Sequence, residues 1–213
     1  MAARLIPARQ ARTEIRVINS RFIATAAPAF TVEEARDFID HINQEFEDAT
    51  HNVPAYVIGH GASTIAHCSD DGEPSGTAGP PALAVLQGSD LGDVVVVVTR
   101  YFGGTKLGTG GLVRAYSEAV REVLSTMPRA MKVPTHTLRV VMPYSLFEPI
   151  QRLVKANQGH IVDKAFAGEV TLSVQLPQHR LTEFQSQLQE LSRGQVEADI
   201  IASSESTIMP LAT

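Results

Sequence analysis

Five consecutive valines followed by a threonine, Val94 to Thr99, constrain the fold of this chain most strongly. An uninterrupted run of β-branched residues is typical of a β-strand that is buried on both of its faces. An apolar run of this length is also far shorter than the roughly 20 residues that a transmembrane helix needs. The run therefore predicts a strand that is buried on both faces and no membrane span.

The residues around this run predict a mixed α and β domain. Thr31-Val32-Glu33-Glu34 has the pattern of a capping box, and the apolar residues after it recur with helical spacing, so a helix is expected there. Shorter strands are expected at residues 55–59 and 64–68. Further helices are expected at residues 77–86, with Pro80 and Pro81 in the first turn, and at residues 112–124.

A second domain is predicted after residues 127–134, which contain two prolines and no hydrophobic periodicity. Apolar residues alternate from Leu138 to Met142 and from Val170 to Leu176, as in strands with one buried face. Ser145 to Glu148 resembles another capping box, and Gly159 and Gly194 are expected to end the two helices of this half. The resulting order, β-α-β-β-α-β, is that of a ferredoxin-like domain.

Composition excludes several classes of protein. The 213 residues carry 18 Lys and Arg against 23 Asp and Glu, a net charge of −5, which argues against a protein that coats nucleic acid. A single cysteine, Cys68, excludes a disulfide scaffold and a cysteine-rich zinc module, and it favours a reducing compartment. Residues 1–16 contain four arginines but no apolar stretch of signal-peptide length, so a cytosolic protein is expected.

Charge is distributed unevenly along the chain. Residues 30–93 contain twelve acidic residues and one basic residue, a net of −11, whereas residues 94–132 contain six basic and two acidic residues, a net of +4. Scattered, solvated charge is the simpler interpretation of such runs. The alternative hypothesis is that the acidic part forms one face of the domain and the basic part another.

Two segments combine glycines with polar residues and carry the candidate chemistry. The first spans residues 48–52 and 69–79, and the second spans residues 99–112. Glycine lets backbone amides approach a ligand, and a helix that follows presents its positive end, which suits a phosphate or a nucleic-acid backbone. The second segment is neither a Walker A loop nor a dinucleotide fingerprint, and glycines of tight turns without a ligand remain the alternative.

Other chemistries are weaker candidates. Asp70, Asp71 and Glu73 with His51 and His67 could hold a hard cation, but the spacing of a calcium loop is absent. Ser75 with His51 could form a hydrolytic pair, although Ser75 does not stand in a nucleophile elbow. Cys68 could be a nucleophile, although a lone cysteine at a strand end is usually a small buried residue.

The same segments resemble the IMPACT/YigZ family. The resemblance rests on Asp48 to Asn52, on Ser69 to Gly79, on Val94 to Tyr116 with its Thr-Arg-Tyr-Phe-Gly-Gly core, and on Ser20 to Ala24. The sequence departs from the family pattern at Val53-Pro54 and at Pro80, where the family commonly has an arginine. The missing arginine removes one candidate phosphate contact.

The resemblance implies an α+β chain of two domains. Residues 1–130 would form a ribosomal protein S5 domain 2-like α/β domain, and residues 135–205 a ferredoxin-like domain similar to domain V of elongation factor G. Eukaryotic members of the family regulate translation initiation. The resemblance therefore implies a role associated with the ribosome or with RNA.

We expect a non-enzymatic, monomeric, cytosolic regulator associated with translation. It would bind RNA, the ribosome or a translation-associated protein through a glycine-rich, basic cleft in the first domain, without a metal or cofactor. The alternative is an enzyme that acts on a phosphorylated small molecule or nucleotide through the same loops. The candidate binding residues are His51, Asp70, Asp71, Glu73, Ser75, Gly76, Thr77, Arg100, Tyr101, Phe102, Gly103, Gly104, Lys106, Gly108, Gly110, Gly111 and Arg114. Arg121 is a further basic residue that could contact phosphate.

Overall fold

The computed structural model describes residues 4–60 and 64–210, and its chain divides into two compact units. The first unit comprises Met1–Ala130 and the second Met131–Thr213. Residues 1–3 and 61–63 of the first predicted domain lie outside the described residues. The chain therefore has two domains of mixed α and β structure, in agreement with the fold class that the sequence predicts.

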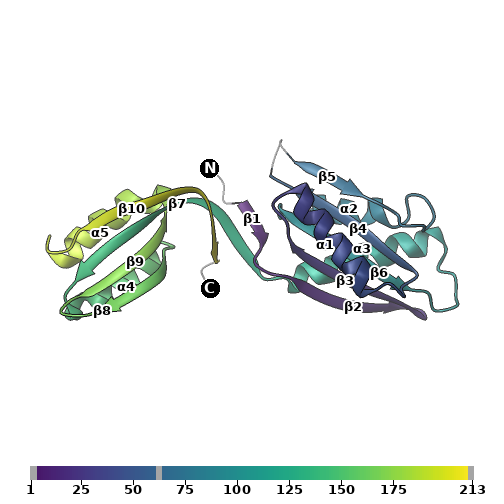
Figure 1. Cartoon of the computed structure of the whole chain (residues 1–213), viewed down its shortest axis with the longest axis horizontal. Helices are drawn as coiled ribbons and strands as arrows, with labels where there is room; N and C mark the ends of the chain where they lie inside the picture. The colour runs from purple at the N-terminus through teal and green to yellow at the C-terminus, as the bar shows by residue number, and fades with distance from the viewer. Residues whose placement is uncertain (1–3, 61–63, 211–213) are drawn as a thin grey trace. The chain divides into compact units, whose positions relative to one another are not determined.

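An antiparallel sheet forms the centre of the first unit (Figure 1). Its strand order is β2-β3-β6-β4-β5, and neighbouring strands run antiparallel. The strands are β2 (Ala11–Val17), β3 (Ser20–Pro28), β4 (His51–Ile58), β5 (Ile65–Cys68) and β6 (Val94–Tyr101). β6, which contains the valine run, lies in the middle of the sheet.

Helices cover both faces of this sheet, which explains why the valine run is buried throughout (Figure 1). Val94, Val96 and Val98 pack in one core with residues of α2 (Gly79–Gln87) and α3 (Gly108–Thr126). Val95 belongs to a separate core on the other face, beneath α1 (Val32–Glu45). A strand between two helical layers buries both sets of alternating side chains, so β-branched residues are favoured at every position.

The local signals at the helix ends are mostly confirmed. The Thr31 hydroxyl accepts a hydrogen bond from the Glu34 N–H at 3.1 Å, and the Glu34 carboxylate accepts from the Phe30 N–H at 2.7 Å, so the first helix is capped as predicted. α2 starts at Gly79, two residues later than expected, and its two prolines occupy the first turn. A Cβ at Gly79 would overlap the Ser69 backbone, so glycine is required at this crossing.

The second unit has its own core and the element order that the sequence predicts. Its strands are arranged in the order β10-β7-β9-β8, with α4 and α5 packed on one face. The helices and strands of this unit, with two short 3-10 helices, are β7 (Arg129–Met142), η2 (Tyr144–Leu146), α4 (Phe147–Ala156), β8 (His160–Phe166), β9 (Val170–Pro177), η3 (Gln178–Arg180), α5 (Leu181–Ser192) and β10 (Ala198–Pro210).

The two units divide after Ala130, and residues 129–134 form the start of β7. The pairing of β7 with β9 begins at Thr135, just beyond Pro134. Two local expectations for this part of the chain are wrong. Ser145 does not cap α4; it lies in a 3-10 turn. The left-handed residue after α4 is Gln158, with φ of 59°, and Gly159 follows it, where a Cβ would press on Val154 and Leu176.

Candidate functional site

The acidic loop between β5 and α2 is organised by Asp70. Its carboxylate accepts hydrogen bonds from the N–H groups of Gly76 at 2.8 Å, Ala78 at 3.0 Å and Gly79 at 2.9 Å. Partial burial opposes ionisation, but these three N–H donors outweigh it and lower the pKa of Asp70. Asp70 therefore holds the loop closed as an ionised carboxylate and has little capacity left for a ligand.

Glu73 points from the same loop into the domain and meets residues from two other elements. Its Oε1 accepts hydrogen bonds from Arg100 Nη1 at 2.6 Å and from the Tyr116 hydroxyl at 2.7 Å. The side chains of Glu73 and Arg100 are only 3% and 6% exposed, and Tyr116 is fully buried. Burial and the bond to Glu73 together raise the pKa of Tyr116 far above its usual value. This cluster joins the acidic loop to β6 and α3.

His51, at the start of β4, lies at the edge of this buried cluster. Its Nδ1 is 2.6 Å from the backbone carbonyl of Asp71, and the Asp71 carboxylate accepts a hydrogen bond from the Asn52 N–H at 2.6 Å. Its Nε2 lies 3.9 Å from Glu73 Oε2. Because a carbonyl can only accept, Nδ1 carries a proton, and Nε2 faces the carboxylate. His51 and Asp71 therefore fasten the loop to the end of the sheet.

Arg100 is an interior residue rather than a surface cation. Besides Glu73, its guanidinium donates to the Ser20 hydroxyl at 3.4 Å and lies over the rings of Phe22 and Phe102, at 5.4 and 5.5 Å from their centroids. Its Nε is buried and has no hydrogen-bond partner among the described residues. The charge of Arg100 is thus neutralised by Glu73 inside the domain, and its guanidinium does not stand free for an external phosphate.

The residues after Arg100 return to the surface. Tyr101 donates a hydrogen bond to Asp48 at 2.7 Å, and this bond, together with partial burial, raises its pKa. Phe102 is 46% exposed and donates its N–H to Thr50 at 3.0 Å. A Cβ at Gly103 would overlap the backbone of Asn19, so glycine is required there. The Thr-Arg-Tyr-Phe-Gly segment is therefore held in place by the turns around residues 19–20 and 48–50.

The glycine-rich stretch at the start of α3 is exposed and has few contacts. Lys106 makes no hydrogen bond or ion pair to any residue that the structure describes. Within the same described residues, no side chain caps the N-terminus of α3. Gly104 and Gly108 have φ of 81° and 71°, which explains these two glycines, whereas a Cβ at Gly110 would meet open space. Arg114, one turn further along, donates to the Gly110 carbonyl at 3.2 Å.

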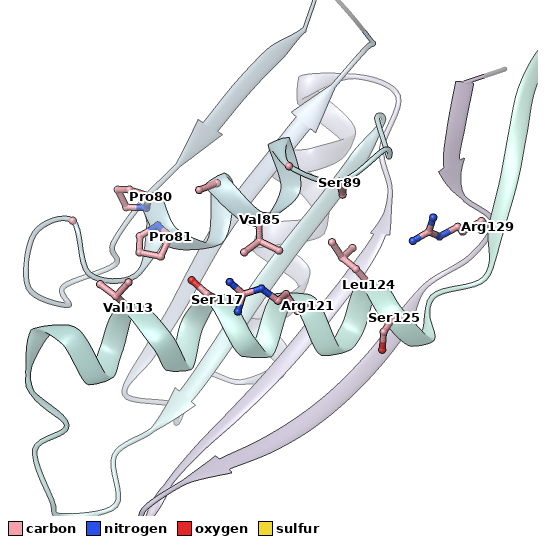
Figure 2. A pocket seen from close by; sticks show the side chains of 13 residues that line it. Pro80, Pro81, Val85, Ser89, Val113, Ser117, Arg121, Leu124, Ser125 and Arg129 are labelled. Atoms are coloured by element: carbon pink, nitrogen blue, oxygen red, sulfur yellow. The ribbon is translucent and has the colours of Figure 1, made fainter. Parts of the chain in front are cut away.

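A groove of about 800 Å³ lies between α2 and α3 (Figure 2). Pro80, Pro81 and Val85 line it from α2, and Val113, Ser117 and Arg121 line it from α3. Two residues considered in the sequence analysis, Gly76 and Arg121, lie along this groove. The two glycine-rich segments thus meet through Glu73 and Arg100 in the interior, and the hollow beside them is lined mostly by other residues.

The remaining chemical alternatives gain little from the geometry. Ser75 is exposed and makes no hydrogen bond to His51 in the described part of the chain, and Thr77 is buried, donating its hydroxyl to the Pro74 carbonyl at 2.6 Å. Burial, and then the Asp70 charge, raise the pKa of Cys68, which disfavours a nucleophilic thiolate. No cluster of three or more metal-binding side chains occurs among the described residues.

The acidic and basic stretches do not form two simple opposing faces. Exposed Glu33, Glu34 and Asp37 give the outer surface of α1 an acidic character. α3, on the other face of the sheet, exposes Arg114 and Arg121 but also Glu118 and Glu122. Its surface is therefore mixed, and the local positive charge lies near Lys106 and along the α2–α3 groove.

Comparison with known proteins gives the family of the chain. A model of the Impact N-terminal domain matches residues 18–124, and a model of a domain of unknown function, DUF1949, matches residues 140–195. The chain belongs to the IMPACT family. This IMPACT family protein is 37% identical over 198 residues to the IMPACT family member YigZ of Escherichia coli strain K12. The aligned residues cover 92% of this chain and 97% of the relative. The chain is 36% identical over 181 residues to YvyE of Bacillus subtilis strain 168, with coverage of 85% and 83%.

One solved structure supports the same relationship. A crystal structure of a hypothetical protein that is 37% identical covers 95% of the IMPACT family chain and 98% of its own, with a TM-score of 0.62. The protein IMPACT of Xenopus laevis is 38% identical over 94 residues, which cover 42% of this chain and 30% of the relative. The match to bacterial relatives extends over both domains, as the resemblance at the sequence level implies.

Sequence reasoning missed two participants in the site. Tyr116 enters the sequence analysis only as the last residue of a motif that carries the family resemblance, and its hydroxyl gives no signal that a carboxylate lies beside it. Ser20 accepts hydrogen bonds from Arg100 and from the Gly103 N–H at 3.3 Å, and nothing in its local pattern indicates this. The helical period places Tyr116 in the interior, and the hydroxyl of a buried tyrosine usually has a hydrogen-bond partner. The sequence therefore indicated that a polar partner of Tyr116 had to lie inside the domain, but it did not identify that partner.

Proposed function

We propose that this protein is a non-enzymatic regulator associated with translation that binds RNA, in the ribosome or free, through the exposed glycine-rich segment at the start of α3. Membership of the IMPACT family supports the association with translation. Lys106 is charged and exposed, and no side chain caps the N–H groups at the start of α3 among the described residues. Both features favour the phosphate groups of a nucleic acid as the ligand. The cytosol is the compartment in which such a protein acts.

The uncapped N-terminus of α3 is the observation that carries the proposal. The first N–H groups of a helix have no partner within the helix, and together with the helix dipole they favour an anion. At α3 no described side chain occupies them, since Leu107 stands at the capping position. Lys106 and Arg114 stand on either side of the first turn in sequence, and both are exposed.

Gly110 adds to this argument. It lies in the first turn of α3, where glycine costs up to about 1 kcal/mol relative to alanine. Neither a positive φ nor a neighbouring atom requires glycine at this position, since a Cβ would meet nothing within 4 Å. A ligand that approaches the backbone closely would require it.

Arg100 and Glu73 have a different role in this proposal. Their buried bond positions the acidic loop and the Phe102 segment, and it does not contact the RNA. Exposed Phe102 is available to stack on a base beside the phosphate contacts. Phosphate contacts of this kind position the nucleic acid without reading its sequence.

The salt dependence of RNA binding tests the proposal. The affinity of the full chain for a fluorescent single-stranded RNA of 12 nucleotides would be measured at several salt concentrations. Each neutralised phosphate on single strands contributes about −0.7 to the log–log slope. Lys106→Ala should therefore make the slope less steep by about 0.7, and Lys106→Ala with Arg114→Ala by about 1.4. Arg36→Ala, an exposed change on α1, is the matched control and should leave the slope unchanged.

A thermal-shift comparison with ATP and a sugar phosphate separates the alternative function. An enzyme acting on a phosphorylated small molecule would be stabilised selectively by one of these ligands, because a ligand stabilises the state to which it binds. Stabilisation by such a compound, with no binding to RNA at low salt, would replace the present proposal by the enzymatic one.

A further inference from the structure

The groove between α2 and α3 has walls of unusual composition for a protein surface (Figure 2). α2, with the sequence GPPALAVLQ, contains no charged residue. Pro80 and Ala84 are nevertheless exposed, and Val85 is half-buried where it faces the groove. A surface helix normally carries charged or polar residues on its outer face, and a helix that is apolar around its circumference is normally covered. The exposed side of α2 therefore lacks the polar face of a solvent-facing helix.

Opposite α2, the groove presents positive charge. Arg121 extends from α3 along the groove toward Ser117, and Arg129 points toward the groove from beyond the end of α3 (Figure 2). These two arginines are the only charged residues among the described residues that line it. Each has one acidic neighbour outside the groove, Glu118 at 3.5 Å from Arg121 and Asp90 at 3.0 Å from Arg129. An arginine has five N–H donors, so each retains donors that a further carboxylate can accept.

The composition favours a protein segment over a nucleic acid as the occupant. Apolar walls gain free energy when apolar side chains cover them, whereas a phosphate backbone leaves them exposed to water. An amphipathic helix that lies in a hydrophobic groove with charges at its edges is a common mode of peptide recognition.

We propose that the α2–α3 groove docks an acidic amphipathic segment of a partner protein. Apolar side chains of the segment would pack against Val85 and Val113, and its carboxylates would pair with Arg121 and Arg129. This surface is distinct from the start of α3 that is proposed for RNA binding. An experiment that contradicts one of the two proposals therefore leaves the other unaffected.

A random peptide library tests the chemistry of the groove without a known partner. Displayed 16-residue peptides would be selected for binding to the full wild-type chain and depleted against Ala84→Glu, which places a charge on the exposed side of α2. Selected peptides should combine acidic residues with Leu, Ile or Phe at helical spacing. A selection that yields no peptides dependent on Ala84, or that enriches basic peptides, would overturn the proposal.

Charge reversal in the groove gives the quantitative test. The synthetic form of an enriched peptide should bind Arg121→Glu at least tenfold more weakly than wild type. Arg36→Glu, the same change at an exposed arginine of α1, lies outside the groove and outside the proposed RNA site and should weaken it less than twofold. Circular dichroism would verify that each variant is folded.

Two further outcomes would also overturn the proposal. Displacement of the peptide by the 12-nucleotide RNA, lost in Arg121→Glu, would assign the groove to nucleic acid. Dimerisation of the wild-type chain in sedimentation experiments, abolished by Arg121→Glu, would assign it to a second copy of this chain.

Discussion

The buried bond between Glu73 and Arg100 should be the largest single electrostatic contribution to the stability of the first domain. Glu73→Gln keeps the size of the side chain but removes its charge, and the guanidinium of Arg100 stays inside with no neutralising partner. Both side chains are almost fully buried, so water cannot replace the lost carboxylate. Removing one partner of a buried pair costs about 3–5 kcal/mol.

This cost is large compared with the roughly 5–15 kcal/mol by which a domain is stable. For a unit of this size, it corresponds to a fall in Tm of roughly 10–20 °C. Scanning calorimetry and urea unfolding followed by circular dichroism at 222 nm, both on the full chain, would measure it. Glu122→Gln on the exposed surface of α3 is the matched control, and its effect should stay within about 0.5 kcal/mol.

A double-mutant cycle separates the pair from its surroundings. Arg100→Met alone should also be strongly destabilising, because it leaves the Glu73 carboxylate buried with only the Tyr116 hydroxyl as a short hydrogen-bond donor. Glu73→Gln combined with Arg100→Met should cost clearly less than the sum of the two single changes, by more than about 1 kcal/mol. A Glu73→Gln variant as stable as the Glu122→Gln control would refute the argument.

Three further predictions concern the same loops. Asp70→Asn should destabilise the domain by about 1–3 kcal/mol at pH 7, since an amide replaces one of the two oxygens that accept N–H bonds. The pKa of Asp70 is lower in the folded protein than in the unfolded chain, so the stabilisation by its carboxylate is present above about pH 4 and is lost as the pH falls through the folded pKa. Urea unfolding at pH 7 and pH 2.5 should therefore show that the difference in stability between wild type and Asp70→Asn is smaller in acid. Asp48→Asn should bring the pKa of Tyr101 down toward its usual value of about 10, which absorbance at 295 nm would follow; an unchanged titration would mean that the bond to Asp48 is not its cause. Gly103→Ala should destabilise the domain by about 1–3 kcal/mol because the new methyl group overlaps Asn19, and a neutral effect in urea unfolding would contradict the packing at this turn.

Local patterns in the sequence predicted the parts of the fold that local physics determines. The valine run predicted a strand that is buried on both faces, because β-branched residues at every position are typical of a strand covered on both sides. The first capping box gave the start of α1 because its hydrogen bonds join residues three or four apart. The second domain followed from the alternation of apolar residues, which reports which side of each strand faces the core.

Interactions between distant residues could not be predicted in the same way. Arg100 was expected on a basic surface because charge counts along the chain do not show that Glu73, 27 residues earlier, folds back onto it. The two glycine-rich segments do come together, but through this buried pair rather than around an open cleft lined by the predicted residues. The α2–α3 groove depends on how two helices pack side by side, and neither helix sequence alone indicates it.

Similar context decides the positions where turn signals misled. Gln158 adopts the left-handed conformation after α4 although glycine follows it, because Gly159 is needed where a side chain would meet Val154 and Leu176. The proline-containing segment after α3 forms the start of β7, and its last proline, Pro134, stands just before the first residue that pairs with β9. In both cases, tertiary packing overrides a local preference.

Gly110→Ala tests the proposed RNA contact most directly, because it should change the affinity for RNA without lowering the stability of the domain. The added methyl group meets no atom of the protein and favours the helix, so the free energy of unfolding should stay the same or rise by up to about 1 kcal/mol. If a phosphate lies against the first turn of α3, the same methyl group should weaken binding of the 12-nucleotide RNA by about tenfold. An affinity equal to that of the wild type, in a variant that is at least as stable, would contradict the proposed site.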